Sequence, residues 1–200
     1  MCTCENINED HPGVKKVLGV VGSPRKQGNT HAMVLSVMEG AKASGAEAEI
    51  VFLGDLNIRE CNGCHACWKT GQCIQNDDMR KLYDKIIQSD AIVFGTPVYW
   101  YGPTALIKAF LDRFVYFNCL ENRSKIKNKS VALVIPFEED DPKTAELIIT
   151  LFERSFNYLD MHLTGTVIAP GLLHKGQVLK NSVIMQSTLE LGKKLILDIS

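Results

Sequence analysis

The stretch KVLGVV (16–21) followed by GSPRKQGNT (22–30) decides the fold. Its first six residues form a short, nearly continuous apolar run rich in valine, which is typical of a strand buried on both faces of a parallel sheet. The next nine are mostly small, polar or basic, and an apolar stripe at helical spacing begins at Met33. We therefore expect a strand, a loop and a helix in direct succession.

The same alternation of strand-like runs and helical stripes continues along the chain and predicts the fold class. Right-handed crossovers between successive strands imply an α/β fold: a doubly wound, five-stranded parallel sheet in a three-layer sandwich. The second and fifth runs are the more polar, so we place them at the edges and expect the sheet order 2-1-3-4-5. The expected strands are 16–21, 47–53, 91–95, 131–135 and 164–169.

In this order the winding reverses between the first and third strands, whose carboxyl ends should border a ligand crevice. No repeat or low-complexity linker interrupts the pattern, so we expect one domain over 15–200 after a flexible tail, 1–14. Asn76 or Asp77 is the expected N-cap of the second helix.

Composition excludes several classes of function. Lys plus Arg (22) nearly cancels Asp plus Glu (23), which argues against nucleic acid or an anionic lipid surface as a partner. The longest uncharged stretch, 91–107, contains glycine and proline residues and cannot form a continuous membrane helix. The first fifteen residues lack the pattern of a signal peptide. We expect a soluble, cytoplasmic protein.

The loop at 22–30 has the character of a phosphate cradle. A strand-to-helix turn of small and hydroxyl residues presents backbone N–H groups and a positive helix dipole to an anion. It lacks the closing Gly-Lys-Ser/Thr of a Walker A loop and the Gly-x-Gly-x-x-Gly of dinucleotide folds. The plainer alternative is a turn with an Asn or Thr helix cap.

GSPR followed by GNT resembles the phosphate loop of the flavodoxin-fold NAD(P)H-dependent FMN reductases. The resemblance implies a flavodoxin-like fold with FMN as cofactor. It also implies that Ser23, Arg25, Asn29 and Thr30 hold the FMN phosphate, while Gly28 lets the loop pass close to it.

The loop after the third strand, GTPVYWYGP (95–103), lies across the same crevice by the topological rule. A flat isoalloxazine ring needs apolar or aromatic walls and exposed backbone amides. The alternative is that the aromatic residues close the end of the core. The loop resembles the segment that wraps the flavin ring in the FMN reductases, which implies a ring site at Pro97, Val98, Tyr99, Trp100 and Gly102. A receiver domain of the same fold needs an Asp at 95–96, which is absent.

Four cysteines with the spacing Cys-x2-Cys-x2-Cys-x5-Cys lie in an expected loop, 57–76. Such spacing suits a [4Fe–4S] cluster, although no proline follows the last cysteine as in bacterial ferredoxins. Other assignments of these cysteines stay open. Three of them could bind zinc together with His65, or all four could be free thiols or redox-active thiols. The segment resembles the compact motif of the iron–sulfur flavoproteins, a branch of the same family, which implies a cluster held by Cys61, Cys64, Cys67 and Cys73.

The acidic run Glu138–Asp141 follows the fourth strand, where the family often has glycines. We interpret it as solvated and as capping the next helix, where carboxylates suit the helix dipole.

The resemblance implies an FMN-dependent NAD(P)H oxidoreductase that passes electrons to a quinone, a flavin or a ferredoxin-type one-electron acceptor. The flavin carries the chemistry, so no catalytic side chain is expected. We expect a homodimer or homotetramer. One alternative is an iron–sulfur flavoprotein electron carrier that is fed by ferredoxin and lacks NAD(P)H activity. Another is a binding or sensor module with zinc at the cysteines and a non-flavin anion in the crevice.

Overall fold

The computed structural model describes residues 13–199, so the expected tail, with Cys2 and Cys4, lies almost wholly outside the described residues. Five parallel strands form one sheet in the order β2-β1-β3-β4-β5, which confirms the predicted order and edges. The strands are β1 (Lys16–Val21), β2 (Glu47–Phe52), β3 (Ala91–Gly95), β4 (Ser130–Pro136) and β5 (His162–Ala169).

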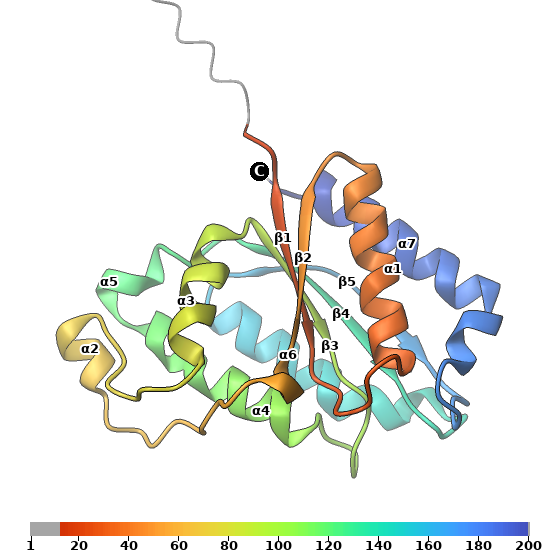
Figure 1. Ribbon diagram of the computed structural model, residues 1–200, viewed down its shortest axis with the longest axis horizontal. Helices are drawn as coiled ribbons and strands as arrows, with labels where there is room; N and C mark the ends of the chain where they lie inside the picture. Colours follow the sequence, from red (N-terminus) through yellow and green to blue (C-terminus); the bar gives the residue numbers. More distant parts are fainter. Residues whose placement is uncertain (1–12, 200) are drawn as a thin grey trace, which may run out of the picture.

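Helices cover both faces of this sheet, as Figure 1 shows. The α-helices are α1 (Asn29–Ala43), α2 (Ala66–Thr70), α3 (Met79–Gln88), α4 (Ala105–Asp112), α5 (Leu120–Arg123), α6 (Glu146–Tyr158) and α7 (Ser182–Leu197). Short 3-10 helices are η1 (Leu53–Asp55), η2 (Arg113–Asn118), η3 (Pro142–Ala145) and η4 (Gln177–Lys180). Among the described residues, none of these helices has the length and apolar character needed to cross a membrane.

Two apolar cores result from the two covered faces. One lies between the sheet and the layer of α3, α4, η2 and α6, and the other between the sheet and α1 with α7. Every residue of β3 and β4 is buried, whereas β2 and β5 are only partly covered. This difference explains why the central strands read as continuous apolar runs and the edge strands do not.

Helices α1 and α7 touch at two glycines. A Cβ atom added to Gly40 would lie 2.0 Å from the Leu189 carbonyl oxygen, and one added to Gly192 would lie 1.9 Å from that of Val37. The two backbones therefore approach as closely as they do because neither position carries a side chain.

Two details of the sequence prediction need correction or refinement. The N-cap of α3 is Asp78, one residue after Asp77, the later of the two predicted positions, although Asp77 Oδ1 still accepts the N–H of Met79 (3.2 Å). In the acidic run, Asp141 accepts the N–H of Lys143 (3.0 Å) and caps η3, directly before α6. Asp141 thus caps the 3-10 helix that leads into α6, whereas α6 itself follows Ala145 and has no side-chain cap.

Candidate functional site

The loop between β1 and α1 presents an open helix N-terminus at the carboxyl edge of the sheet (Figure 1). Gly28 is the N-cap of α1, and neither a capping side chain nor an acidic residue occupies the first turn. The loop turns back on itself, because the Gly28 N–H donates to the Arg25 carbonyl (3.2 Å). Ser23 Oγ accepts the Arg25 N–H (3.2 Å). Free N–H groups and the positive end of the helix dipole make this edge suited to an anion.

A cavity of about 170 Å³ lies against this loop and contains most of the predicted cofactor residues. It brings together the predicted phosphate loop (22–30) and the loop after β3, with further walls from the loops after β4 and β5. Its predicted lining residues are Ser23, Arg25, Gly28, Asn29, Thr30, Pro97, Val98 and Tyr99. Trp100 and Gly102 do not line it.

The tip of the loop after β3 forms a tight reverse turn. Tyr99 and Gly102 exchange two backbone hydrogen bonds of 2.8 and 3.0 Å, and between them Trp100 and Tyr101 both have positive φ (49° and 58°). Such backbone is rare for bulky residues and is typical of a two-residue type I′ turn. Trp100 is 97% exposed, so its ring extends into solvent.

Residues of the loop after β5 complete the cavity, and the sequence analysis did not single them out. Leu172, Leu173 and Lys175 line it together with Phe137 and Glu138 from the loop after β4. The signal that could have found them is topological, since parallel strands share one carboxyl edge and the loop after β5 must emerge beside the crevice.

Asn29 joins this loop to the phosphate loop. Its amide nitrogen donates to the His174 carbonyl (3.0 Å), and its amide oxygen accepts the Val178 N–H (3.1 Å). Asn29 therefore lines the cavity, while its side-chain amide is hydrogen-bonded to the backbone of the loop after β5 and of η4.

A second cavity of about 730 Å³ adjoins the first through Ser23, Arg25, Tyr99 and Lys175. Its other walls come from the end of β2 and the start of α4. Lys26 lines it and pairs with Asp55 (2.8 Å). The crevice formed by these two cavities offers groups that fit FMN. Cationic side chains and an open helix N-terminus suit the phosphate, and apolar walls suit the ring.

The cysteine segment, defined here as residues 61–73, leaves the sheet after β2 and contains α2. Cys67 is buried, Cys64 is exposed, and Cys61 and Cys73 are half-buried. Burial raises the pKa of the Cys67 thiol, and the neighbouring Cys73 and Cys119 thiols raise it further. In type and number the donors fit an iron–sulfur cluster, but within 13–199 no three Cys, His, Asp or Glu side chains are gathered closely enough to hold a metal ion.

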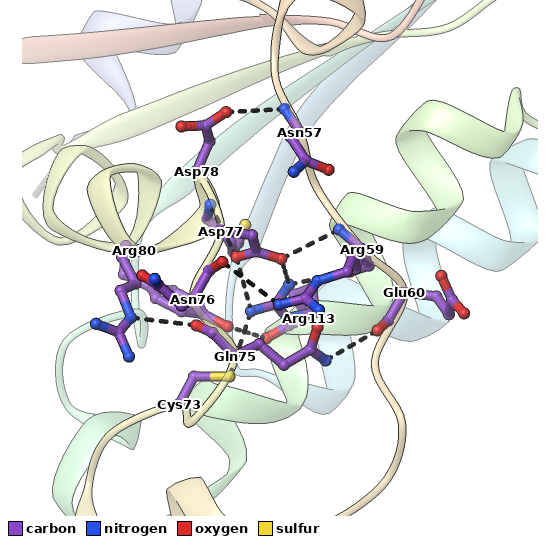
Figure 2. A network of polar contacts seen from close by, with 12 residues as sticks. Asn57, Arg59, Glu60, Cys73, Gln75, Asn76, Asp77, Asp78, Arg80 and Arg113 are labelled. Atoms are coloured by element: carbon purple, nitrogen blue, oxygen red, sulfur yellow. Dashed lines mark hydrogen bonds and ion pairs between the residues drawn. The ribbon is translucent and has the colours of Figure 1, made fainter.

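The two chain limbs that flank the cysteine segment are hydrogen-bonded to each other, as Figure 2 shows. We call this pairing of 57–60 with 75–78 the polar zipper. Its bonds are Asn57 N–H to Asp78 Oδ2 (2.8 Å), Asp78 N–H to the Asn57 carbonyl (3.1 Å), Arg59 N–H to Asp77 Oδ2 (3.1 Å) and Gln75 Nε2 to the Glu60 carbonyl (3.0 Å).

Arg113, the first residue of η2, forms a buried ion pair with Asp77 at the centre of this zipper (Figure 2). Burial alone would raise the pKa of the Asp77 carboxyl, but hydrogen bonds from Arg113 and from the Arg59 N–H outweigh it and hold that pKa below its usual value. Burial alone would lower the pKa of the Arg113 guanidinium, but the Asp77 carboxylate raises it above its usual value. Both groups are therefore charged at neutral pH.

Comparison with known proteins shows what the chain is similar to. Residues 15–139 match the sequence model of a family described as NADPH-dependent FMN reductase. An iron–sulfur flavoprotein of Archaeoglobus fulgidus is 37% identical over 114 residues, which cover 57% of this chain and 50% of the relative. Another, of Methanosarcina thermophila, is 29% identical over 185 residues, 90% of this chain and 93% of the relative. The chain thus spans about half the length of several curated relatives and nearly all of another.

Solved structures resemble the fold as a whole. A NAD(P)H:quinone oxidoreductase from Methanothermobacter marburgensis superposes with a TM-score of 0.72 at 13% identity, covering 92% of this chain and 98% of that one. At this identity the likeness shows the fold alone, a flavodoxin-like doubly wound sheet.

Proposed function

Because the chain belongs to the NADPH-dependent FMN reductase family, we propose that it is an FMN-dependent oxidoreductase that uses NAD(P)H to reduce a quinone, a flavin or a one-electron acceptor. The observation that carries the proposal is the crevice itself. An uncapped helix N-terminus, Arg25 and Lys175 border one cavity together with the apolar walls Pro97 and Val98.

The protein's task in this proposal is to bind and orient the cofactor. The first turn of α1, Ser23, Arg25 and Thr30 hold the phosphate, and Lys175 adds a positive charge from the loop after β5. Pro97, Val98 and Tyr99 flank the ring. When bound, FMN supplies the redox chemistry, accepting a hydride and passing electrons onward, so the chain need not contribute an acid–base pair or a nucleophile.

The absorption spectrum of the purified protein, followed by steady-state oxidation of NADPH and NADH with a quinone acceptor, tests this function. We expect flavin bands, FMN and not FAD on extraction, and turnover that requires the acceptor. A colourless protein that binds no added FMN would remove the proposal. Light scattering of the same sample tests the predicted homodimer or homotetramer.

A second candidate function is that of an iron–sulfur flavoprotein. It is supported by the Cys-x2-Cys-x2-Cys-x5-Cys spacing and by relatives that carry this name. We propose Cys61, Cys64, Cys67 and Cys73 as the ligands.

Iron and sulfide analysis after anaerobic reconstitution decides this candidate. We expect about four irons per chain. Cys64→Ala should lose cluster iron, whereas the matched control Cys119→Ala should retain it. Equal iron in the parent and Cys64→Ala proteins contradicts the ligand assignment.

A further inference from the structure

Two buried threonines connect the loop after β1 with the loop after β3. Thr96 is fully buried, and Thr104, the N-cap of α4, is 2% exposed. The Thr104 hydroxyl donates to the carbonyl of Gly22, the first residue after β1, and accepts the Ile107 N–H (3.3 Å). The Thr104 N–H donates to the Thr96 hydroxyl (3.2 Å), which in turn donates to the Pro97 carbonyl (3.0 Å). These bonds form one chain from the predicted phosphate loop to a predicted wall of the ring site.

Both hydroxyls are committed to the protein. A threonine hydroxyl has a single hydrogen to donate. Thr104 uses it on the Gly22 carbonyl. Thr96 uses it on the Pro97 carbonyl. Thr104 also lines the larger cavity, but donating to a ligand there would take the hydrogen away from the carbonyl of the buried Gly22, which is costly. The two side chains therefore act on the backbone of the loops.

The two loops begin side by side at the sheet and then diverge. The Gly22 N–H donates to the Gly95 carbonyl (2.8 Å). From there one loop leads to Gly28 and the other to the turn at 99–102, and both border the smaller cavity. The threonine chain extends the connection beyond the sheet as far as Pro97, which lines that cavity.

We infer that Thr96 and Thr104 are positioning residues that set the distance between the phosphate half and the ring half of the cofactor site. The inference rests on the proposed FMN function. A ligand that carries both a phosphate and a ring gains from the second contact only where the geometry lets it reach both halves at once. A small change in their separation should therefore weaken binding of the whole ligand and spare binding of either half alone.

Replacing the Thr104 hydroxyl tests this role. Thr104→Val keeps the shape of the side chain and removes its bonds to Gly22 and Ile107. We expect the affinity for FMN to fall about tenfold. Affinity for riboflavin, which has the ring without the phosphate, and for inorganic phosphate should equal that of the parent. Thr104→Ser retains the hydroxyl and should restore the parent affinity for FMN.

Thr188→Val is the matched control. Thr188 is also fully buried, and its hydroxyl is hydrogen-bonded to Ser36 Oγ and to the Met185 carbonyl (2.8 Å each), between α7 and α1 and away from both loops. This variant should bind all three ligands as the parent does. If Thr104→Val does not fold, Thr96→Val leaves the cap of α4 in place and should give the same pattern of affinities.

The measurement is isothermal titration calorimetry of the full chain, freed of flavin, with FMN, riboflavin and inorganic phosphate in turn. Far-ultraviolet circular dichroism checks that each variant is folded. A loss confined to FMN in Thr104→Val, with recovery in Thr104→Ser, supports the positioning role.

Several results would overturn it. Unchanged FMN affinity in Thr104→Val, or no recovery in Thr104→Ser, removes the role of the hydroxyl. An equal loss for riboflavin or for phosphate shows damage to one half of the site, and an equal loss in Thr188→Val shows an effect of general destabilisation. Each of these leaves the FMN function standing, whereas a parent protein that binds no FMN overturns that function and this inference together.

Discussion

The side chain of Asn29 accepts the backbone N–H of Val178 (3.1 Å) and so ties the start of α1 to the segment before α7. Because the same amide donates to the His174 carbonyl (3.0 Å), both hydrogen-bonding ends of one side chain are used on a single loop. The loop that carries Lys175 to the crevice is thereby held against the phosphate loop. The side-chain amide of a residue predicted to bind phosphate is thus hydrogen-bonded to the loop that completes the cavity.

Replacing Asn29 should weaken cofactor binding through this loop. Asn29→Ala removes two hydrogen bonds, each of which contributes about 0.5–1.5 kcal/mol. We expect faster amide hydrogen exchange at Val178 and lower FMN affinity. Asn29→Asp retains the acceptor for Val178 and should preserve protection at that amide. Unchanged exchange in Asn29→Ala would contradict the tie between the two loops.

The phosphate loop should discriminate FMN from riboflavin. Arg25→Ala with Thr30→Ala removes a charge-assisted contact and a hydroxyl contact, and FMN binding should weaken by about 2–4 kcal/mol. Riboflavin lacks the phosphate, so its affinity should be the same in parent and variant. Fluorescence titration with both flavins measures the difference, and equal losses for the two ligands would show that the variant damages the ring site instead.

The contact between α1 and α7 should not accept a methyl group. Gly40→Ala or Gly192→Ala places a Cβ against a backbone carbonyl, and we expect a loss of about 1–3 kcal/mol in the free energy of unfolding. Gly54→Ala is the matched control, because its nearest neighbour would lie 3.8 Å away. Urea unfolding followed by circular dichroism measures all three, and a stable Gly40→Ala protein would mean that the helices can separate at little cost.

Lowering the pH should remove the contribution of the Asp77–Arg113 ion pair to the free energy of unfolding. The pKa of the Asp77 carboxyl is lowered in the folded protein, so its stabilising effect is complete above the ordinary Asp value of about 3.9 and disappears as pH falls through the lower folded value. Asp77→Asn leaves Arg113 buried without an anion and should cost about 3–5 kcal/mol at neutral pH.

This deficit in Asp77→Asn should shrink as the pH is lowered from about 4, because the parent then loses the same ion pair. Free energies of unfolding of both proteins, measured from pH 7 to pH 3, provide the test. A constant difference across that range would mean that Asp77 does not titrate with folding.

Strands and their order could be predicted because burial on two faces leaves a local mark on the sequence. KVLGVV and AIVFG coincide with β1 and β3 to the residue, while Thr164–Ala169 misses the first two residues of β5. The edge strand is less apolar at its start, where His162 is exposed. The predicted 131–135 likewise misses one residue at each end of the buried β4, so local apolar character marks the middle of a strand better than its ends.

The candidate site could be predicted only where it is contiguous in sequence. The loops at 22–30 and 95–103 each carry a recognisable pattern, and the structure brings them to one cavity. The sequence around Lys175 and Arg113 has no recognisable pattern, because the residues that surround each of them come from distant segments of the chain. Arg113 meets Cys73 across forty positions of chain, and no local periodicity reports such a contact. The resemblance of its loop implies Trp100 in the ring site, but the direction of its side chain depends on the backbone of a two-residue turn.

The polar zipper also makes the cysteine segment structurally independent of the sheet. Its two limbs, 57–60 and 75–78, are hydrogen-bonded to each other at the base of the cysteine segment. The distance between the end of β2 and the start of α3 therefore does not depend on the length or conformation of the segment. Added residues between 61 and 73 would lengthen a closed loop, and the entropy of loop closure grows only slowly with length. A segment on such a joint can gain, lose or exchange residues, its cysteines included, while the rest of the fold keeps its shape.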